Sequence, residues 1–320
     1  MTYRSFLHED EFATRMHDEV LPYLHARRED GSFQTADGAT LHTVYYTADE
    51  PRGCVVILHG LSEHTEKYHE LCYYFLKNDL SVFLYDQRGH GHSTREVPNG
   101  IVHIRSFSQY DEDLNALLTA MADKLPTPLY LFAHSMGGAV AALYLERGKT
   151  LFEKAWLTAP AISVHVKGAP RPFVWLTCAA ACVLGKGKHR IHTMSAPLPP
   201  DKETNRNSSC ASRARFEALR TVKKSDPLLW SAKPSYAWLL AAMKATRRIL
   251  RKKRLQNVQT PLRLYAAERD HLVELAPQCR FIADVPNGSA CMIAHARHEL
   301  FSERDALSHP YFDDLLDYFT

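Results

Sequence analysis

The sequence lacks several features that assign a protein to a class at once. Its seven cysteines are scattered and form no C-x-x-C pair, which argues against a disulfide framework or a zinc site and favours reduced thiols in the cytoplasm. It has no glycine-rich phosphate loop, so ATP and NAD are not expected as cofactors. The net charge of +3 over 320 residues is too small to indicate a nucleic-acid partner.

Long hydrophobic runs are also missing. The most apolar run, residues 172–185, has fourteen residues, whereas a helix needs about 20 to cross a bilayer. The first residues, "MTYRSFLHEDEF", carry acids and histidine where a secretion signal carries a basic and then an apolar segment. We therefore expect a soluble cytoplasmic protein, with peripheral contact at the inner face of the membrane left open.

Six short apolar runs, separated by helical stretches, indicate the fold. Continuous apolar strands that end in glycine or charged residues are typical of a parallel sheet that is buried on both faces. A D-G turn within residues 35–46 predicts an antiparallel hairpin before them. We expect an α/β fold with a mostly parallel central sheet flanked by helices. The six runs span residues 53–60, 80–91, 128–135, 154–161, 261–270 and 290–299.

The alternation of strands and helices stops between residues 162 and 255. An insertion that interrupts a parallel sheet usually covers the edge where ligands bind, so we predict a helical lid over 162–255 on a core formed by 1–161 and 256–320. The lid contains the apolar run, a polar loop over 197–209 and one helix over 235–255. The apolar run could line a tunnel, touch a membrane or pack as a buried helix.

The stretch "LYLFAHSMGGAVAALYLE", residues 129–146, combines a strand, a tight turn and a helix. A small-x-Ser-x-Gly turn between a strand and a helix is the nucleophile elbow of α/β-hydrolases, which lifts the serine oxygen clear of the sheet. Here Ala133 and Gly137 flank Ser135, with His134 beside it, and Ala133 adds a methyl where glycine is usual. We predict that Ser135 is a nucleophile. An ordinary glycine turn is the alternative.

A serine nucleophile needs a base and an acid, which follow it in the order acid and then histidine in this fold. Asp270 comes directly after a late strand, with Glu268 and Glu274 as weaker candidates. His298 follows the last strand and is the predicted base. His295 lies within or beside the apolar run, where we expect it to pack.

Hydrolysis through a serine also needs two N–H groups that stabilise an oxyanion. The N–H of Met136, next to the nucleophile, is one predicted donor, and the N–H of Leu61 is the other. Each such donor is worth about 3 kcal/mol in the transition state. His59 and Gly60 precede Leu61, and we expect them to hold the loop rather than react.

With eighteen histidines, the chain has to be considered for metal binding. His90 and His92 are close in sequence, and so are His295 and His298, but neither pair has carboxylates or thiolates at ligand spacing. H-E-x-x-H is absent. No metal centre is predicted.

Several motifs resemble those of one family. "HGLSEHTEKYHEL", "YDQRGHGHS" and "HSMGGA" are similar to the H-G-x-x-E-H-x-x-R-Y, D-x-R-G-H-G-x-S and nucleophile segments of the bacterial lysophospholipase and monoacylglycerol lipase branch of the α/β-hydrolases, often filed with the serine aminopeptidases. Residues 224–242 resemble the lysophospholipase lid, and "AERDHLV" and "RHELFSERD" complete the match. The departures are Ala133 for glycine, Lys67 for arginine, and a lid middle over 191–210 that does not match.

The resemblance implies an α/β-hydrolase that cleaves carboxylic esters of lysophospholipids or monoacylglycerols. Ser135 would form an acyl-enzyme, with His298 moving the proton and Asp270 orienting it. The basic residues between 244 and 254 are either a solvated helix end or a contact for anionic lipid head groups. An aminopeptidase or a short-chain carboxylesterase on the same three residues, or a non-catalytic binding protein, are the alternatives. No cofactor or nucleic acid is implied.

Overall fold

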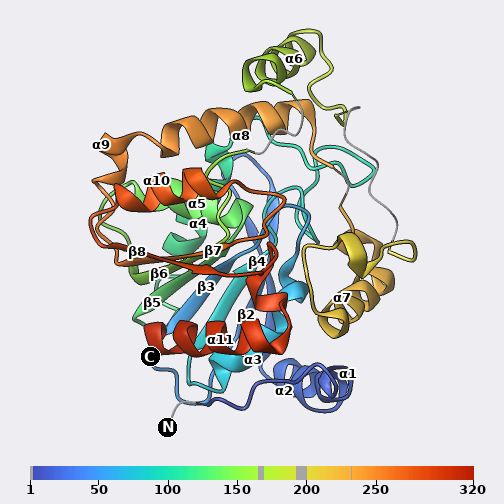
Figure 1. Ribbon diagram of the computed structural model, residues 1–320, viewed down its shortest axis with the longest axis vertical. Coiled ribbons are helices and arrows are strands. Elements are labelled where there is room, and N and C mark those ends of the chain that lie inside the picture. The colour runs from blue at the N-terminus through green and yellow to red at the C-terminus, as the bar shows by residue number, and fades with distance from the viewer. Residues whose placement is uncertain (1–2, 165–168, 192–199, 232) are drawn as a thin grey trace.

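The computed structural model describes residues 3–164, 169–191, 200–231 and 233–320. One 8-stranded sheet runs through the molecule in the order β1-β2-β4-β3-β5-β6-β7-β8 (Figure 1). The bounds of the strands are β1 Arg28–Gln34, β2 Thr40–Tyr46, β3 Cys54–Leu58, β4 Ser81–Tyr85, β5 Leu129–His134, β6 Phe152–Thr158, β7 Leu262–Ala267 and β8 Gly288–Ile293.

The strand pairing confirms the predicted fold. β1 and β2 form an antiparallel hairpin, β2 pairs antiparallel with β4, and all later neighbours are parallel. The six apolar runs become β3 to β8. The predicted hairpin is correct, although its first strand begins earlier, at Arg28. Gly38 closes the D-G turn with a φ of 86°, a conformation that glycine adopts without strain.

Both faces of the sheet are buried from β3 to β7, as the continuous apolar strands predicted. The prediction is wrong for the last apolar run, because β8 lies at the margin of the sheet and is largely exposed, with Met292 at 50%. In β3, Val56 and its alternate neighbours Cys54 and Leu58 enter one hydrophobic core, whereas Val55 and Ile57 enter the other. This alternation follows from the two-residue period of a strand. Parallel strands that are covered on both sides leave only their ends open to solvent. Functional groups of such a sheet therefore gather at the carboxyl ends of its strands.

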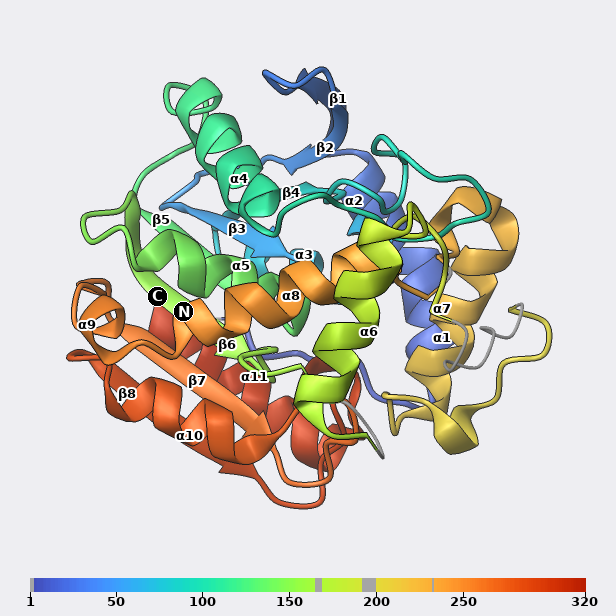
Figure 2. The ribbon, with the colours of Figure 1, turned by 90° about the horizontal axis from the view of Figure 1, so that it is seen from above.

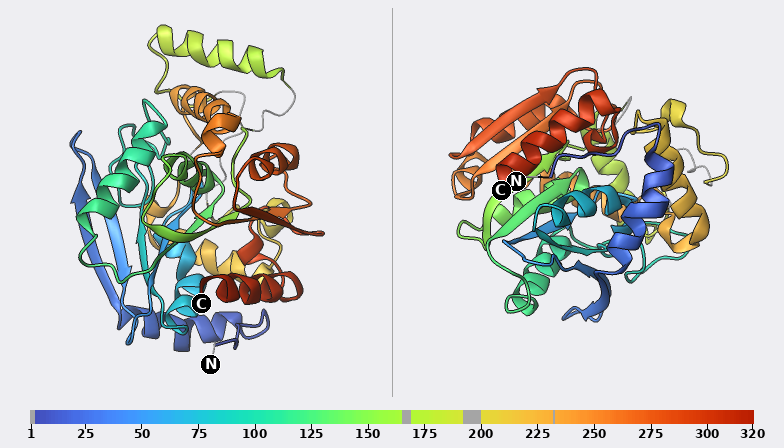
Figure 3. Two further views of the ribbon diagram at one scale, coloured as in Figure 1. Left: turned by 90° about the vertical axis from the view of Figure 1, so that its left-hand side faces the viewer. Right: turned by 90° about the horizontal axis from the view of Figure 1, so that it is seen from below.

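Helices form the two covering layers (Figures 2 and 3). α4, α5, α8 and α10 supply the first core, and α3 and α11 supply the second. The helices are α1 Phe12–Arg15, α2 Leu21–His25, α3 His69–Leu76, α4 Ser108–Ala120, α5 Met136–Leu145, α6 Arg171–Val183, α7 Arg213–Ser225, α8 Tyr236–Ile249, α9 Lys252–Leu255, α10 Leu275–Ala283 and α11 Asp305–Phe319. Single turns are η1 Met16–Val20, η2 Thr65–Tyr68, η3 Asn205–Asn207, η4 Pro227–Leu229 and η5 Leu300–Ser302.

Helices α6 to α9 lie between β6 and β7, where the lid was predicted. α6 stands at the top of the molecule in Figure 1, above α8. α8 itself packs against α5 and belongs to the first core. The boundaries at 161/162 and 255/256 stay predictions. The polar loop over 197–209 and the unmatched lid middle over 191–210 include residues 192–199, which are outside the described residues.

One detail of the predicted lid is wrong. The expected single helix over 235–255 is two, because Arg251 adopts extended backbone with φ −83° and ψ 112°. That turn buries Leu255 and brings Arg254 Nε to 2.6 Å from Glu146 Oε2 on the core. Of the three roles left open for the apolar run, a buried helix does not fit, since Cys178 is the buried residue of α6, while Val183 at its end is 87% exposed.

Among the described helices, none combines the length and the apolar character needed to cross a membrane.

Candidate active site

Ser135 stands at the turn between β5 and α5 with backbone angles of φ 50° and ψ −116°. Such angles are sterically costly for any residue except glycine. Hydrogen bonds on both sides hold the turn: Ser135 N–H donates to Thr158 O at 3.1 Å, and Ala161 N–H donates to Ser135 O at 2.8 Å. The strained strand-turn-helix predicted for this segment is therefore present.

The small residues around Ser135 have a visible steric purpose. A Cβ at Gly137 would lie 2.2 Å from the carbonyl oxygen of Leu58, and a Cβ at Gly138 would lie 2.5 Å from Pro160 Cβ. Both distances are far below contact, so glycine is required for α5 to pack against β3 and β6. Ala133, in contrast, is a buried residue of regular strand β5, so its extra methyl fits where glycine is usual.

Asp270 and His298 come together at the same edge of the sheet. Asp270 follows β7, and His298 Nδ1 lies 2.6 Å from Asp270 Oδ2. The other carboxylate oxygen accepts hydrogen bonds from the N–H groups of Leu272 and Val273 at 2.7 and 3.0 Å. Burial by itself would raise the pKa of Asp270, but these hydrogen bonds and the neighbouring imidazole outweigh burial and lower that pKa. The carboxylate is thus ionised beside the ring.

The alternative acids and the second histidine lie elsewhere. Glu268 accepts a hydrogen bond from the N–H of His295 at 2.7 Å, and Glu274 lies near Arg171 of α6. The expectation that His295 packs in the apolar run is wrong, since its side chain is 69% exposed. β8 ends at Ile293, and the chain then turns through His295 with a φ of 64°, which points this ring outward.

Ser135 and His298 line one cavity of about 1230 Å³. The ring of His134, the residue before Ser135, lies 4.7 Å from the ring of His298, centroid to centroid. The cavity extends beneath α6 and toward α7, where Phe173 and Phe216 supply apolar wall. Ser135 and His298 thus share one large, partly apolar cavity, and Asp270 contacts His298.

The two predicted oxyanion donors line the same cavity. Leu61 and Met136 are both among its wall residues. In the part of the chain that the structure describes, neither N–H donates a hydrogen bond to another protein group. The N–H of Met136 is one of the unpaired donors that every helix leaves in its first turn. Both donors are therefore available to a bound anion.

The loop that carries Leu61 is held from behind, as expected for His59 and Gly60. His59 is buried, its Nδ1 donates to Gly60 O at 2.8 Å, and its Nε2 accepts from the N–H of Gln87 at 2.9 Å. Burial lowers the pKa of His59 and keeps the ring neutral. Gly60 N–H donates to Glu63 Oε2 at 2.7 Å. This pattern occupies both ring nitrogens of His59, so neither nitrogen is free for proton transfer with a substrate.

A buried ion network that the sequence reasoning missed braces this loop. Glu63 accepts hydrogen bonds from Lys67 Nζ and Tyr68 Oη, each at 2.6 Å, and Lys67 Nζ also lies 2.8 Å from Glu299 Oε1. Glu63 Oε1 is 3.4 Å from His134 Nε2. Burial alone would lower the pKa of Lys67, but the two carboxylates raise it. The one available signal was that Glu63 and Lys67 occupy polar positions of the opening motif.

Comparison with known proteins shows that the chain is similar to several lipid hydrolases. The chain is 25% identical to a probable lysophospholipase L2 of Haemophilus influenzae over 79% of each chain. It is 34% identical to a monoacylglycerol lipase of Mycolicibacterium smegmatis over 50% of this chain and 54% of that one. A variant of monoglyceride lipase from Saccharomyces cerevisiae, solved with a substrate analogue, shares the fold with a TM-score of 0.70 at 22% identity, covering 92% and 97% of the two chains.

The family assignment rests on a longer match. Residues 49–305 fit the model of the family described as serine aminopeptidase, S33, a span that begins before β3 and ends in the first residue of α11. It therefore includes the elbow, the loop of Leu61, Asp270 and His298. The chain belongs to the serine aminopeptidase family of α/β-hydrolases.

Proposed function

We propose that this chain hydrolyses carboxylic esters of lipids, lysophospholipids or monoacylglycerols, through an acyl-enzyme on Ser135. The observation that carries the proposal is the positive-φ elbow of Ser135 in the wall of a cavity that His298, bonded to Asp270, also lines. Lysophospholipases and monoacylglycerol lipases among the relatives support the same activity. Carboxylic ester hydrolysis is the reaction class that both lines of evidence share.

The mechanism follows from which ring nitrogen is occupied. Asp270 engages His298 Nδ1, so Nε2 is the nitrogen that accepts the proton of Ser135 Oγ as this oxygen attacks the ester carbonyl. The N–H groups of Leu61 and Met136 stabilise the oxyanion. His298 then gives its proton to the departing alcohol. In the second half of the reaction, His298 takes a proton from water as the water oxygen attacks the acyl carbonyl. His298 then returns the proton to Ser135 Oγ, and the fatty acid leaves.

The cavity suits an acyl chain. Each buried CH₂ contributes about 0.8 kcal/mol to binding, and the cavity offers Phe173, Val174 and Cys178 of α6 together with Phe216 and Leu219 of α7. Both helices belong to the segment that we propose as the lid. A long chain would thus be recognised by helices that lie outside the sheet.

The aminopeptidase alternative has little support from the cavity. A peptidase that removes N-terminal residues needs a carboxylate free to bind the amine. Every glutamate that lines the cavity already lies within 3.4 Å of a basic side chain: Glu63 and Glu299 with Lys67, Glu66 with Arg28, Glu70 with Arg215, and Glu203 with Lys223. An N-terminal amine would have to displace one of these partners.

Contact with an anionic membrane surface is a further part of the proposal. α6 presents Phe173, Leu176 and Val183 at 64%, 59% and 87% exposure, which is unusual for large apolar residues on one helix. A second cavity of about 750 Å³ beside the end of α6 is lined by the basic residues Arg105, Lys188, Lys244 and Arg248. Apolar residues beside cations suit a lipid interface. A cytoplasmic location remains a prediction.

The test is a hydrolysis panel of lysophospholipids, monoacylglycerols, short-chain esters and aminoacyl amides, run beside labelling with an active-site-directed phosphonate. We expect fatty esters to be preferred and the label to sit on Ser135. Ser135→Ala should lose on the order of 10⁶ in turnover. Preference for aminoacyl amides would favour the peptidase, preference for short esters the carboxylesterase, and no turnover at all the binding protein. Retention of most esterase activity by Ser135→Ala would refute the assignment.

A further inference from the structure

A second cluster of histidine and carboxylate lies outside the cavity of Ser135. It joins His42 on β2, Asp86 just after β4, and His92 in the loop that follows. His42 Nδ1 is 3.2 Å and His92 Nδ1 is 3.9 Å from the same oxygen, Asp86 Oδ2. The two rings are 5.0 Å apart at an interplanar angle of 80°. One ligand atom of each residue lies within 4.8 Å of the others.

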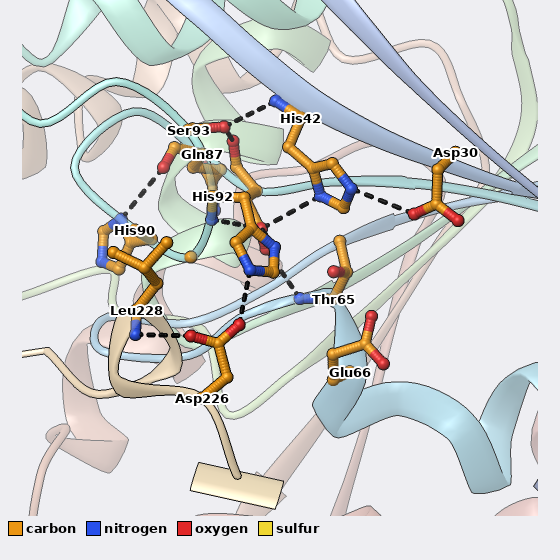
Figure 4. A network of polar contacts seen from close by, with 12 residues as sticks. Asp30, His42, Thr65, Glu66, Gln87, His90, His92, Ser93, Asp226 and Leu228 are labelled. Atoms are coloured by element: carbon orange, nitrogen blue, oxygen red, sulfur yellow. Dashed lines mark hydrogen bonds and ion pairs between the residues drawn. The ribbon is translucent and has the colours of Figure 1, made fainter.

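The far nitrogen of each ring is held by its own carboxylate. His42 Nε2 lies 3.1 Å from Asp30 Oδ1, and His92 Nε2 lies 2.6 Å from Asp226 Oδ2; Figure 4 shows both rings pointing at these acids. An outer carboxylate that fixes the ring and raises its basicity is the usual partner of a histidine that binds metal. Both histidines have one here.

Asp86 is rigidly placed between them. Its side chain is fully buried, and it accepts hydrogen bonds from the N–H of Thr65 at 2.8 Å and of His92 at 2.9 Å. Gly91, with a φ of 46°, passes so close that a Cβ would lie 2.0 Å from Asp86 Oδ2. The carboxylate oxygen at the centre of the cluster therefore has a fixed position, and the outer carboxylates of Asp30 and Asp226 hold the two rings around it.

We propose that His42, Asp86 and His92 bind a divalent transition-metal ion, with Zn²⁺ as the best match to two imidazole nitrogens and one carboxylate oxygen. Ligand atoms around a tetrahedral zinc ion are about 3.4 Å apart, given bond lengths near 2.0–2.1 Å. The observed distances of 3.2 and 3.9 Å from Asp86 Oδ2 to the two ring nitrogens are close to this spacing, and one ligand atom of each residue lies within 4.8 Å of the others. Water would complete the fourth position.

The position of the site indicates a structural rather than a catalytic ion. None of the three ligands lines the cavity of Ser135. Asp226, which holds His92, lies in the proposed lid and starts η4 by accepting the N–H of Leu228 at 2.8 Å. Arg95, a few residues after His92, donates to Leu228 O at 2.6 Å. The ion would therefore tighten the joint between this lid segment and the core.

The described residues contain one other candidate group, and it serves as an internal comparison. His8, Asp305 and His309 also lie close together. However, His309 Nε2, the nitrogen that lies 3.5 Å from Asp305 Oδ1, is also 3.1 Å from Leu7 O, so a backbone carbonyl competes for the atom that would bind the ion, and His8 is 61% exposed. Asp305 is also engaged by Arg215 Nη1 at 2.9 Å. These features make it the weaker site and its histidine a suitable control.

The experiment titrates the full-length, metal-stripped chain with ZnCl₂ by calorimetry and with CoCl₂ by visible absorption. We expect one ion per chain with a Kd on the order of 1 µM and intense cobalt bands typical of four-coordinate geometry. His92→Ala should abolish both signals. Asp226→Asn, which removes only the outer carboxylate, should weaken affinity 10–100-fold. His309→Ala should bind as the wild type does.

Hydrolysis of a short-chain ester checks that each variant is folded, since the site is separate from Ser135. Wild-type protein that binds neither ion below 100 µM in these titrations would overturn the proposal. So would a His92→Ala protein with unchanged stoichiometry and affinity, or binding that is lost in His309→Ala instead.

Discussion

The edge of the sheet around Ser135 and the helices between β6 and β7 are built in opposite ways. At the edge, buried partners on both sides fix each important group, as Glu63 and Gln87 fix the loop of Leu61. In α6, Cys178 is the buried residue, and Val183 is almost fully exposed. In the proposed function, the fixed edge of the sheet carries the reaction, and the less constrained helices are where selection of substrate and surface can vary. Four experiments test this contrast, in order of decreasing effect.

The largest effect is expected for Asp270→Asn. The amide cannot hold His298 in the tautomer that accepts the proton of Ser135, so kcat should fall about 10⁴-fold. Glu268→Gln is the matched control, because Glu268 is 43% exposed and bonds to His295 instead. Steady-state kinetics on a short-chain ester measures both. A loss of less than tenfold in Asp270→Asn would remove Asp270 from the proposed mechanism.

Two glycines test the rigidity of the two regions directly. Gly137→Ala places a Cβ 2.2 Å from backbone in the core, whereas Gly187→Ala, after α6, places one 3.3 Å from the side chain of Cys182. Gly137→Ala should displace the N–H of Met136 and lose at least 10²–10³ in kcat, with a lower Tm. Gly187→Ala should behave as the wild type. Equal losses in both variants would mean that the lid is as tightly fixed as the elbow.

The contrast predicts a lipid effect that is confined to the lid. We expect activity on vesicles to rise with the content of anionic lipid, and this rise to disappear when Lys244, Arg247 and Arg251 are replaced by glutamine. These residues are exposed, and each charge contributes about 1 kcal/mol near an anionic surface. Turnover of a short-chain ester in solution is the control and should not change. Indifference of the wild type to lipid charge would defeat the idea.

The smallest effect concerns the joint between α9 and the core. Burial raises the pKa of Glu146 to about 7 in spite of its hydrogen bond from Arg254. A carboxyl with a raised pKa holds its proton longer in the folded state, so stability falls as pH increases from about 4.5 to 7. Glu146→Gln removes this dependence. Over the same pH interval, the Tm of the variant should therefore fall by a few degrees less than the Tm of the wild type. Parallel Tm curves for the two proteins would contradict the shift.

The sequence alone predicts those features of the structure that depend on local pattern. The sheet was predictable because continuous apolar strands are read directly from the chain, and Ser135 was predictable because its elbow signal lies within five neighbouring residues. The placement of Asp270 and His298 together follows from the topology of the sheet. Their roles in the reaction stay predictions until the variants above are measured.

The features that the sequence does not predict depend on contacts between residues that are distant in the chain. The network of Glu63 and Lys67 is completed by Glu299, more than 230 positions later. The turn at Arg251 that separates α8 from α9 brings Arg254 to Glu146, more than 100 positions earlier in the chain. The spacing of the histidines in the sequence could not reveal the carboxylate partner of His92, because Asp226 lies in a distant part of the chain. No local sequence pattern predicts these contacts.

The left-handed backbone of Ser135 also bears on any attempt to engineer a hardier enzyme. A non-glycine residue held in so sparsely populated a conformation costs about 1–3 kcal/mol, a sizeable share of the 5–15 kcal/mol that keeps a typical domain folded. Glycine at this position would relax the turn and delete the nucleophile in one step. Heat resistance and turnover therefore compete at a single peptide unit, and gains in robustness have to be sought away from it.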